Sequence, residues 1–125
     1  METQKAYTLH EEHKIWLNKL DFYADDIMIQ EKCLQEVVAK NTDKEVLAMA
    51  HHFENQFIMR KEQIDELRHS IKEHELFIAN KISHNPAADH VDMNDHPKER
   101  DTIETFEKSF AESRTEFVGF LSKVM

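Results

Sequence analysis

The sequence predicts an all-α protein: an elongated antiparallel three-helix bundle with up-down-up topology and coiled-coil-like heptad packing. Apolar residues recur in alternating steps of four and three over three long stretches, which is the spacing of helices packed along their length. One Gly and two Pro leave few turn formers for hairpins or sandwiches. A chain of 125 residues has the size of a single domain, so we expect one bundle over residues 1–125.

The longest of these stretches predicts the second helix, over about residues 43–83. Its seam runs from Val46 to Ile78 and is interrupted only by Arg60 and His74. No Pro or Gly occurs there, so the helix should be about 60 Å long at about 1.5 Å per residue. A helix of this length is not stable alone in water and needs neighbours.

The first helix is predicted over about residues 8–40. Thr8 to Glu11 has the form of a capping box, in which the Thr hydroxyl and the Glu carboxylate satisfy backbone N–H groups. A second capping box, from Thr42 to Glu45, follows after a very short break. The second helix must therefore fold back on the first as an antiparallel hairpin.

Residues 84–95 include turn formers and small polar residues, so we expect the one loop there. The third helix is predicted over about residues 96–124. Asp95 can cap this helix, and Pro97 is tolerated in its first turn. Four phenylalanines make its seam the bulkiest part of the core: Phe106, Phe110, Phe117 and Phe120.

Charge and cysteine content narrow the partners and the compartment. A formal charge of -9, with the basic residues dispersed among acids, argues against nucleic acid and against anionic membrane surfaces. No run approaches the about 18 apolar residues of a membrane span. Cys33 is the only cysteine, and the first residues lead into no apolar signal segment, so we expect a cytoplasmic protein.

The relative lengths of the helices predict self-association. A third helix that starts beside the far end of the second would end near Phe57 and Ile27, and the hairpin tip would then lack a third helix. The apolar residues of the tip would then form an exposed patch larger than a monomer usually carries. We therefore expect a homodimer, or another helical partner, at this tip. A third helix shifted or bent toward the tip would remove this need. The predicted interface residues are Met28, Ile29, Leu34, Val38, Leu47, Met49, Phe53, Ile58 and Met59.

Nine histidines and 25 acids raise the question of a metal site. His13 and His74 occupy seam positions on facing helices, where they could share a hydrogen bond, titrate as a pH sensor, or bind a metal with a carboxylate such as Glu73. We find no inward carboxylate in the seam beside them, so we expect structural histidines and no cofactor. Glu66 and His69 have the E-x-x-H spacing of di-iron bundles, but their heptad positions face solvent.

The predicted loop offers a second group of metal-ligating side chains: His84, Asp89, His90, Asp92, Asp95 and His96. These residues lack the spacing of an EF-hand loop, which needs a glycine at its turn and a terminal bidentate glutamate. We therefore expect a surface loop.

Arg60 breaks the seam of the second helix with a charge. A charged side chain at such a position needs a partner, and Asp26 or the Tyr23 hydroxyl should be in reach. A polar layer of this kind fixes helix register. The alternative is a buried anion or ligand site.

The sequence carries no recognisable catalytic motif, and with one Gly it cannot hold a phosphate loop or a dinucleotide fingerprint. We expect a non-enzymatic interaction or scaffold protein that self-associates through the hairpin tip. The alternative is a small metal-binding bundle that uses His13, His74 and nearby carboxylates. Sensitivity to a chelator distinguishes the two functions.

Overall fold

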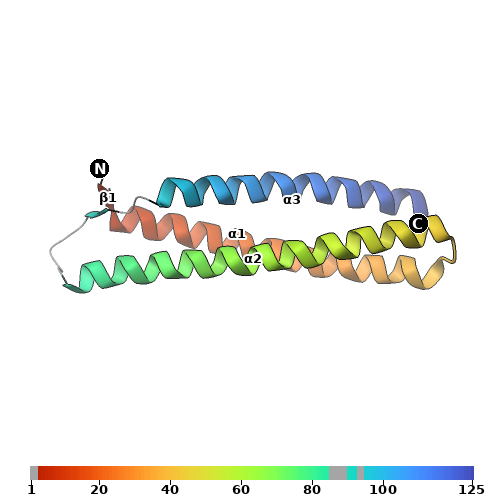
Figure 1. The fold of residues 1–125 in the computed structure, drawn as a ribbon, viewed down its shortest axis with the longest axis horizontal. Helices are drawn as coiled ribbons and strands as arrows, with labels where there is room; N and C mark the ends of the chain where they lie inside the picture. The colour runs from red at the N-terminus through yellow and green to blue at the C-terminus, as the bar shows by residue number, and fades with distance from the viewer. Residues whose placement is uncertain (1–2, 85–89, 93–94) are drawn as a thin grey trace.

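The computed structural model describes residues 3–84, 90–92 and 95–125 and consists mainly of three long helices lying side by side (Figure 1). The helices are α1 (Ala6–Lys40), α2 (Lys44–His84) and α3 (His96–Val124). α1 and α2 form an antiparallel hairpin, and α3 runs back along them toward the hairpin tip (Figure 1). The predicted all-α three-helix bundle is confirmed.

Two short strands were not predicted. β1 (Thr3–Lys5) pairs antiparallel with β2 (His90–Asp92), so part of the chain between α2 and α3 is joined to the start of α1. Strands of three residues are too short to give an alternating sequence pattern.

The first two helices begin at residues other than the predicted caps. α1 begins at Ala6, two residues before Thr8, directly after β1 and without a side-chain cap. At the start of α2, Asp43 Oδ1 accepts hydrogen bonds from the backbone N–H groups of Glu45 (2.8 Å) and Val46 (3.3 Å). Asp43 therefore caps α2 in place of Thr42.

The third helix follows Asp95 as predicted, and Pro97 lies in its first turn. The Asp95 side chain makes no capping hydrogen bond, however. The first turn is held instead by burial of His96 and Glu99 between the other helices.

The core follows the predicted seams along the bundle axis. Phe117 shows the packing: its ring centroid lies 5.3 Å from that of Phe53 and 5.2 Å from that of Phe57. The buried seam residues are Leu9, Trp16, Leu20, Ile27, Leu34, Val37, Ala50, Phe53, Phe57, Ile64, Leu67, Ile71, Ile78, Ile103, Phe106, Phe110, Phe117 and Phe120.

The position of α3 along the hairpin corrects a prediction. α3 starts at the level of His13, whose ring centroid lies 5.0 Å from that of His96, and not beside the end of α2. Near its other end, Phe120 packs on Phe53 with ring centroids 5.1 Å apart. The prediction that the hairpin tip lacks a third helix is therefore wrong. β2, which follows α2 in the sequence, pairs with β1 at the start of α1 (Figure 1).

α3 does not cover the end of the bundle opposite the hairpin tip, where α1 begins and α2 ends (Figure 1). We call this the open end of the bundle. There Leu76 is 70% exposed and Phe77 is 40% exposed. A small second core, formed by Ala6, Leu9 and Ile78, joins α1 to α2 at this end.

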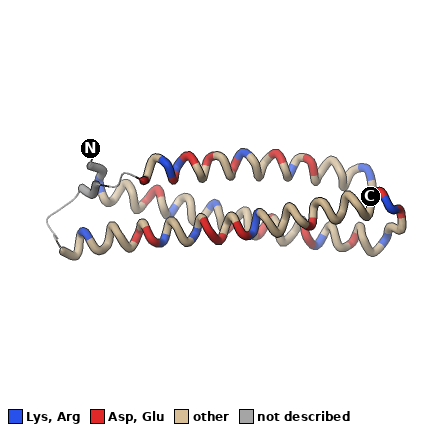
Figure 2. Tube along the Cα trace, in the orientation of Figure 1, with Lys and Arg blue, Asp and Glu red and all other residues tan. Residues whose placement is uncertain are grey.

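Charged residues of both signs are interspersed along the three helices (Figure 2). Ion pairs join α1 to α2, as between Asp21 and Arg68 at 2.7 Å, and α1 to α3, as between Asp26 and Arg114 at 3.0 Å. Each surface pair contributes little free energy, but together they favour one register. No helix in the described ranges combines the length and the apolar character that crossing a membrane requires.

Candidate metal site of buried histidines and glutamates

Histidine and glutamate side chains from all three helices meet near the open end of the bundle. At their centre, the fully buried His13 ring lies 5.9 Å from the His74 ring and 5.0 Å from the His96 ring, measured between centroids. We call this group the histidine–glutamate cluster, and its members are Glu12 and His13 on α1, His74 and Glu75 on α2, and His96 and Glu99 on α3.

The heptad spacing explains why these side chains point inward. His13 lies in the seam of α1 between Leu9 and Trp16, and His74 lies in the seam of α2. On α3 the seam continues back from Ile103, by four residues to Glu99 and by three more to the buried His96. The heptad spacing that builds the apolar core therefore also places these polar side chains at the bundle axis, at the level of His13.

Three of these side chains form a candidate ligand set. His74 Nδ1 lies 2.8 Å from Glu99 Oε1, and His13 Nε2 lies 3.3 Å from the same oxygen. One ligand atom from each of these three residues lies within 4.8 Å of the others. Ligand atoms about 2.0–2.2 Å from a tetrahedral zinc ion are roughly 3.3 Å apart, so only small side-chain adjustments are needed to hold such an ion.

Neighbouring side chains hold two of these ligands in place. Glu75 Oε1 lies 2.6 Å from His13 Nδ1, and this contact directs His13 Nε2 toward Glu99. Ser70 Oγ donates a 2.8 Å hydrogen bond to the other carboxylate oxygen of Glu99. A carboxylate behind the non-ligating nitrogen is usual for metal-binding histidines in proteins.

The electrostatics of the cluster favour a positive charge beside Glu99. Burial lowers the pKa of His13, but the Glu99 and Glu75 carboxylates more than offset this and raise it above its ordinary value. Burial likewise raises the pKa of Glu99, but contacts with His13 and Ser70 and the nearby His74 bring it below its ordinary value. The Glu99 side chain is only 4% exposed, so its negative charge must be balanced within the cluster.

In the other part of the cluster, around Glu12 and His96, the charges already balance. Arg100 donates two hydrogen bonds to Glu12, of 2.9 and 2.8 Å, and this lowers the pKa of Glu12 to about 2. Burial lowers the pKa of His96, which favours a neutral ring whose Nε2 is hydrogen-bonded to Glu12. Because Arg100 neutralises Glu12, this part of the cluster needs no further cation.

A surface depression of about 260 Å³ between α2 and α3 reaches the candidate ligands. His74 and Glu99 line it together with Ser70 and Lys98. A metal ion could therefore reach two of the three ligands from solvent without opening the bundle.

The structure keeps two of the three predicted ligand candidates and replaces the third. His13 and His74 meet as predicted, but Glu73 is exposed and lies 2.9 Å from His69 on the outer face of α2. The expectation that no inward carboxylate accompanies the two histidines is wrong, because Glu99 lies between them. Extending the third seam back from Ile103 would have identified it.

The predicted loop site falls largely outside the described residues. Asp89 is not among them, and the side chains of His90 and Asp92 are not described. His84 ends α2 and its Nδ1 lies 2.8 Å from the Asn80 carbonyl oxygen. His96 belongs to the histidine–glutamate cluster.

The predicted interface residues divide into two groups. Leu34 and Phe53 are 3% and 2% exposed, so they belong to the core; they were assigned to an interface because α3 was placed too far from the tip. Leu47 is half-buried. The other six are exposed: Met28, Ile29, Val38, Met49, Ile58 and Met59.

No protein-family model, curated protein or solved structure matches this chain. The function is therefore inferred from the geometry of the histidine–glutamate cluster itself.

Proposed function

We propose that this protein binds a divalent metal ion through His13 Nε2, an imidazole nitrogen of His74 and a carboxylate oxygen of Glu99. The observation that carries the proposal is His13 Nε2: among the described residues this buried atom has no hydrogen-bond partner, yet it lies 3.3 Å from Glu99 Oε1. Two imidazoles and one carboxylate suit zinc and other borderline divalent ions.

The charge of the cluster supports the same proposal. With Glu12 paired to Arg100, two carboxylates face only histidines: Glu75, which contacts His13 and the exposed His10, and Glu99. In the metal-free protein, the raised pKa of His13 favours a proton that balances part of this negative charge. One divalent ion balances it fully, so binding should displace this proton and leave the bundle folded.

Three protein ligands leave one position of a tetrahedral ion open. The depression lined by His74 and Glu99 gives water or a small ligand access to this position. The proposed function is metal binding by a non-enzymatic protein, without an assigned reaction.

Calorimetric titration of ZnCl₂ into untagged, chelator-treated protein tests the proposal. We expect one ion per chain and at least about tenfold weaker binding in Glu99→Gln, because the replacement keeps the shape and removes the ligand charge. Glu73→Gln, at the exposed position next to His74, is the matched control and should bind like the wild type. Absence of stoichiometric binding, or equal binding by Glu99→Gln and wild type, would overturn the proposal.

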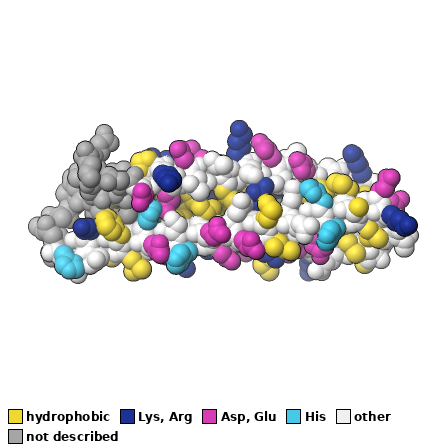
Figure 3. All heavy atoms as spheres, viewed as in Figure 1, with side chains coloured by type: hydrophobic (Ala, Val, Ile, Leu, Met, Phe, Trp, Pro, Cys, Tyr) yellow, Lys and Arg dark blue, Asp and Glu magenta, His cyan; other side chains and the backbone are white. Residues whose placement is uncertain are grey.

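We propose self-association near the hairpin tip as a second candidate function. Its support is the set of six exposed apolar residues named above, which follow the tip-side half of α1 and α2. Figure 3 shows hydrophobic side chains gathered toward this end on the face that it displays. A groove of about 240 Å³, lined in part by Val38 and Leu34, lies between the two helices there and could receive side chains of a second copy.

Sedimentation velocity tests this second candidate. The wild type should be a dimer at about 100 μM, and Ile58→Asp should shift it to monomer because a charge cannot be buried unpaired at an interface. Leu76→Asp, at the exposed open end, should remain dimeric. A monomeric wild type would remove this candidate without affecting the metal site.

The cytoplasmic location stays a proposal from the sequence.

A further inference from the structure

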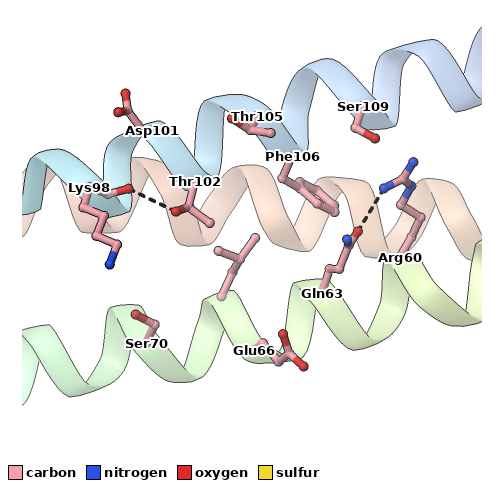
Figure 4. A pocket seen from close by; sticks show the side chains of 11 residues that line it. Arg60, Gln63, Glu66, Ser70, Lys98, Asp101, Thr102, Thr105, Phe106 and Ser109 are labelled. Atoms are coloured by element: carbon pink, nitrogen blue, oxygen red, sulfur yellow. Dashed lines mark hydrogen bonds between the residues drawn. The ribbon is translucent and has the colours of Figure 1, made fainter. Parts of the chain in front are cut away.

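A groove between α2 and α3, farther from the open end than the histidine–glutamate cluster, forms a second candidate site (Figure 4). Its volume of about 610 Å³ is within the range of small-molecule pockets. We call it the α2–α3 groove. Its lining includes Arg60 and Leu67 of α2 and Lys98, Thr105 and Phe106 of α3.

Arg60, at one end of the groove, is a half-buried cation with only neutral partners. Its Nη1 donates to Gln63 Oε1 at 3.0 Å, and its Nη2 donates to Ser113 Oγ at 2.8 Å. Its Nε is buried and has no hydrogen-bond partner in the part of the chain that the structure describes. Within the described ranges, no carboxylate lies within 4.0 Å of the guanidinium, so its charge is not balanced by the protein there.

The predicted partners of Arg60 are engaged elsewhere. Asp26 accepts hydrogen bonds from Gln30 and Arg114, at 2.8 and 3.0 Å. The Tyr23 ring packs against the phenylalanines of α3. The prediction that one of these two residues pairs with Arg60 is therefore wrong.

An unbalanced, half-buried guanidinium is costly unless an anion joins it. Arg60 has five N–H donors, and the two neutral acceptors use two of them. The Gln56 amide oxygen, one helical turn away, also has no hydrogen-bond partner in the described ranges. A neutral amide cannot balance the charge of Arg60, and Gln56 does not line the groove. A carboxylate from solvent supplies both the charge and the acceptors.

The rest of the groove favours an organic anion over a bare ion. Leu67 and Phe106 give it an apolar floor, and hydroxyl groups of serines and threonines surround this floor. In Figure 4 the Lys98 side chain extends toward the groove from its other end, whereas Asp101 and Glu66 turn away from it. The groove thus presents an apolar surface with a cation at each end.

We propose that the α2–α3 groove binds an amphipathic organic carboxylate, with its anionic group at Arg60 and its apolar body over Leu67 and Phe106. The groove adjoins the depression that reaches His74 and Glu99, but Arg60 is not part of the histidine–glutamate cluster. The proposal therefore does not rest on metal binding, and it is tested on metal-free protein.

Calorimetric titration of decanoate into chelator-treated protein tests the proposal, with decanol as the uncharged probe of equal chain length. We expect one decanoate per chain and at least about tenfold weaker binding in Arg60→Met, because the charge-assisted hydrogen bonds are lost. Lys61→Met is the matched control: Lys61 is the next residue of α2 and pairs with Glu31 of α1 at 2.9 Å. It should bind decanoate like the wild type.

A variant at the rim keeps the test independent of any effect of Arg60 on folding. Thr105 is exposed on α3, so Thr105→Phe should fold normally and narrow the groove while Arg60 stays in place. We expect it to weaken decanoate binding by at least about tenfold, because a larger side chain competes for the same apolar floor. The proposal is overturned if decanoate does not bind, if Arg60→Met binds it equally well, or if decanol or inorganic phosphate binds as tightly as decanoate.

Discussion

His74 Nδ1 on α2 lies 2.8 Å from Glu99 Oε1 on α3, and this contact joins the two helices at the first turn of α3. His13 of α1 completes the group from the third side, with Nε2 3.3 Å from the same oxygen. One carboxylate oxygen therefore faces an imidazole from each of the other two helices. A bound cation at this point links all three helices, so metal binding and bundle stability should be coupled.

The first prediction concerns metal-linked stability. A metal ion that binds only the folded chain raises the free energy of unfolding by about 2.7 kcal/mol when the free ion is at about 100 times its dissociation constant. Urea unfolding with and without zinc should show this increase for the wild type, and a chelator should reverse it. Glu99→Gln should show little or no increase. An equal increase in both proteins would mean that the ion binds elsewhere.

The second prediction concerns the pH dependence of stability through Glu12. Hydrogen bonds from Arg100 and His96 lower its pKa in the folded protein from 4.5 to about 2. Because the folded-state pKa is the lower one, this stabilisation is present above about pH 4.5 and is lost as pH falls toward 2. Its upper limit is about 3.5 kcal/mol, at roughly 1.4 kcal/mol per pKa unit, and solvent screening of the part-exposed Glu12–Arg100 pair lowers it.

Urea unfolding of Glu12→Gln at several pH values between 7 and 2.5 measures this contribution. The variant should be less stable than the wild type at pH 7, and the difference should shrink as the pH is lowered. Glu116→Gln, an exposed position on α3, serves as the control and should follow the wild type. A difference that stays constant with pH would contradict the assigned pKa.

The third prediction tests the position of α3 at the hairpin tip. Phe53 is 2% exposed and packs against Phe117 and Phe120, so Phe53→Ala should leave a cavity and reduce the free energy of unfolding by about 3–5 kcal/mol. Met49→Ala, on the exposed surface one turn away, should change it by less than about 0.5 kcal/mol. Equal, small effects in urea unfolding would indicate that α3 does not cover the tip.

The fourth prediction concerns the one glycine. Gly119 lies inside α3, and a Cβ added there meets nothing within 4 Å. Gly119→Ala should therefore raise the free energy of unfolding by about 1 kcal/mol, through helix propensity and lower entropy of the unfolded chain. Thermal unfolding checks this, and a lower melting temperature would show that the site is less open than described.

The sequence predicted the helices well because one spacing rule determines both helix and core. Every apolar seam residue that the fold needs, from Leu9 on α1 to Phe120 on α3, follows steps of four and three. The axial position of α3 was not predictable in this way, because it depends on the path of the chain between α2 and α3. A heptad pattern fixes which face of a helix is buried but not how far the helix is shifted along its neighbours.

The candidate site was predictable in part. His13 and His74 interrupt apolar seams, so their inward positions could be read from spacing alone. Glu99 lies in the first turn of α3, where an acid favours the helix dipole, so its residue type alone does not indicate a place in the seam. Glu75 flanks the seam and reaches His13 sideways, at 2.6 Å, which no periodicity reveals.

Crystals of untagged protein soaked in zinc, with anomalous diffraction recorded at the zinc absorption edge, test the central claim most directly. We expect one strong peak about 2.0–2.2 Å from His13 Nε2, from a His74 nitrogen and from a Glu99 oxygen. A peak at the exposed His69 and Glu73 pair with none between the helices, or no peak at all, would contradict the account.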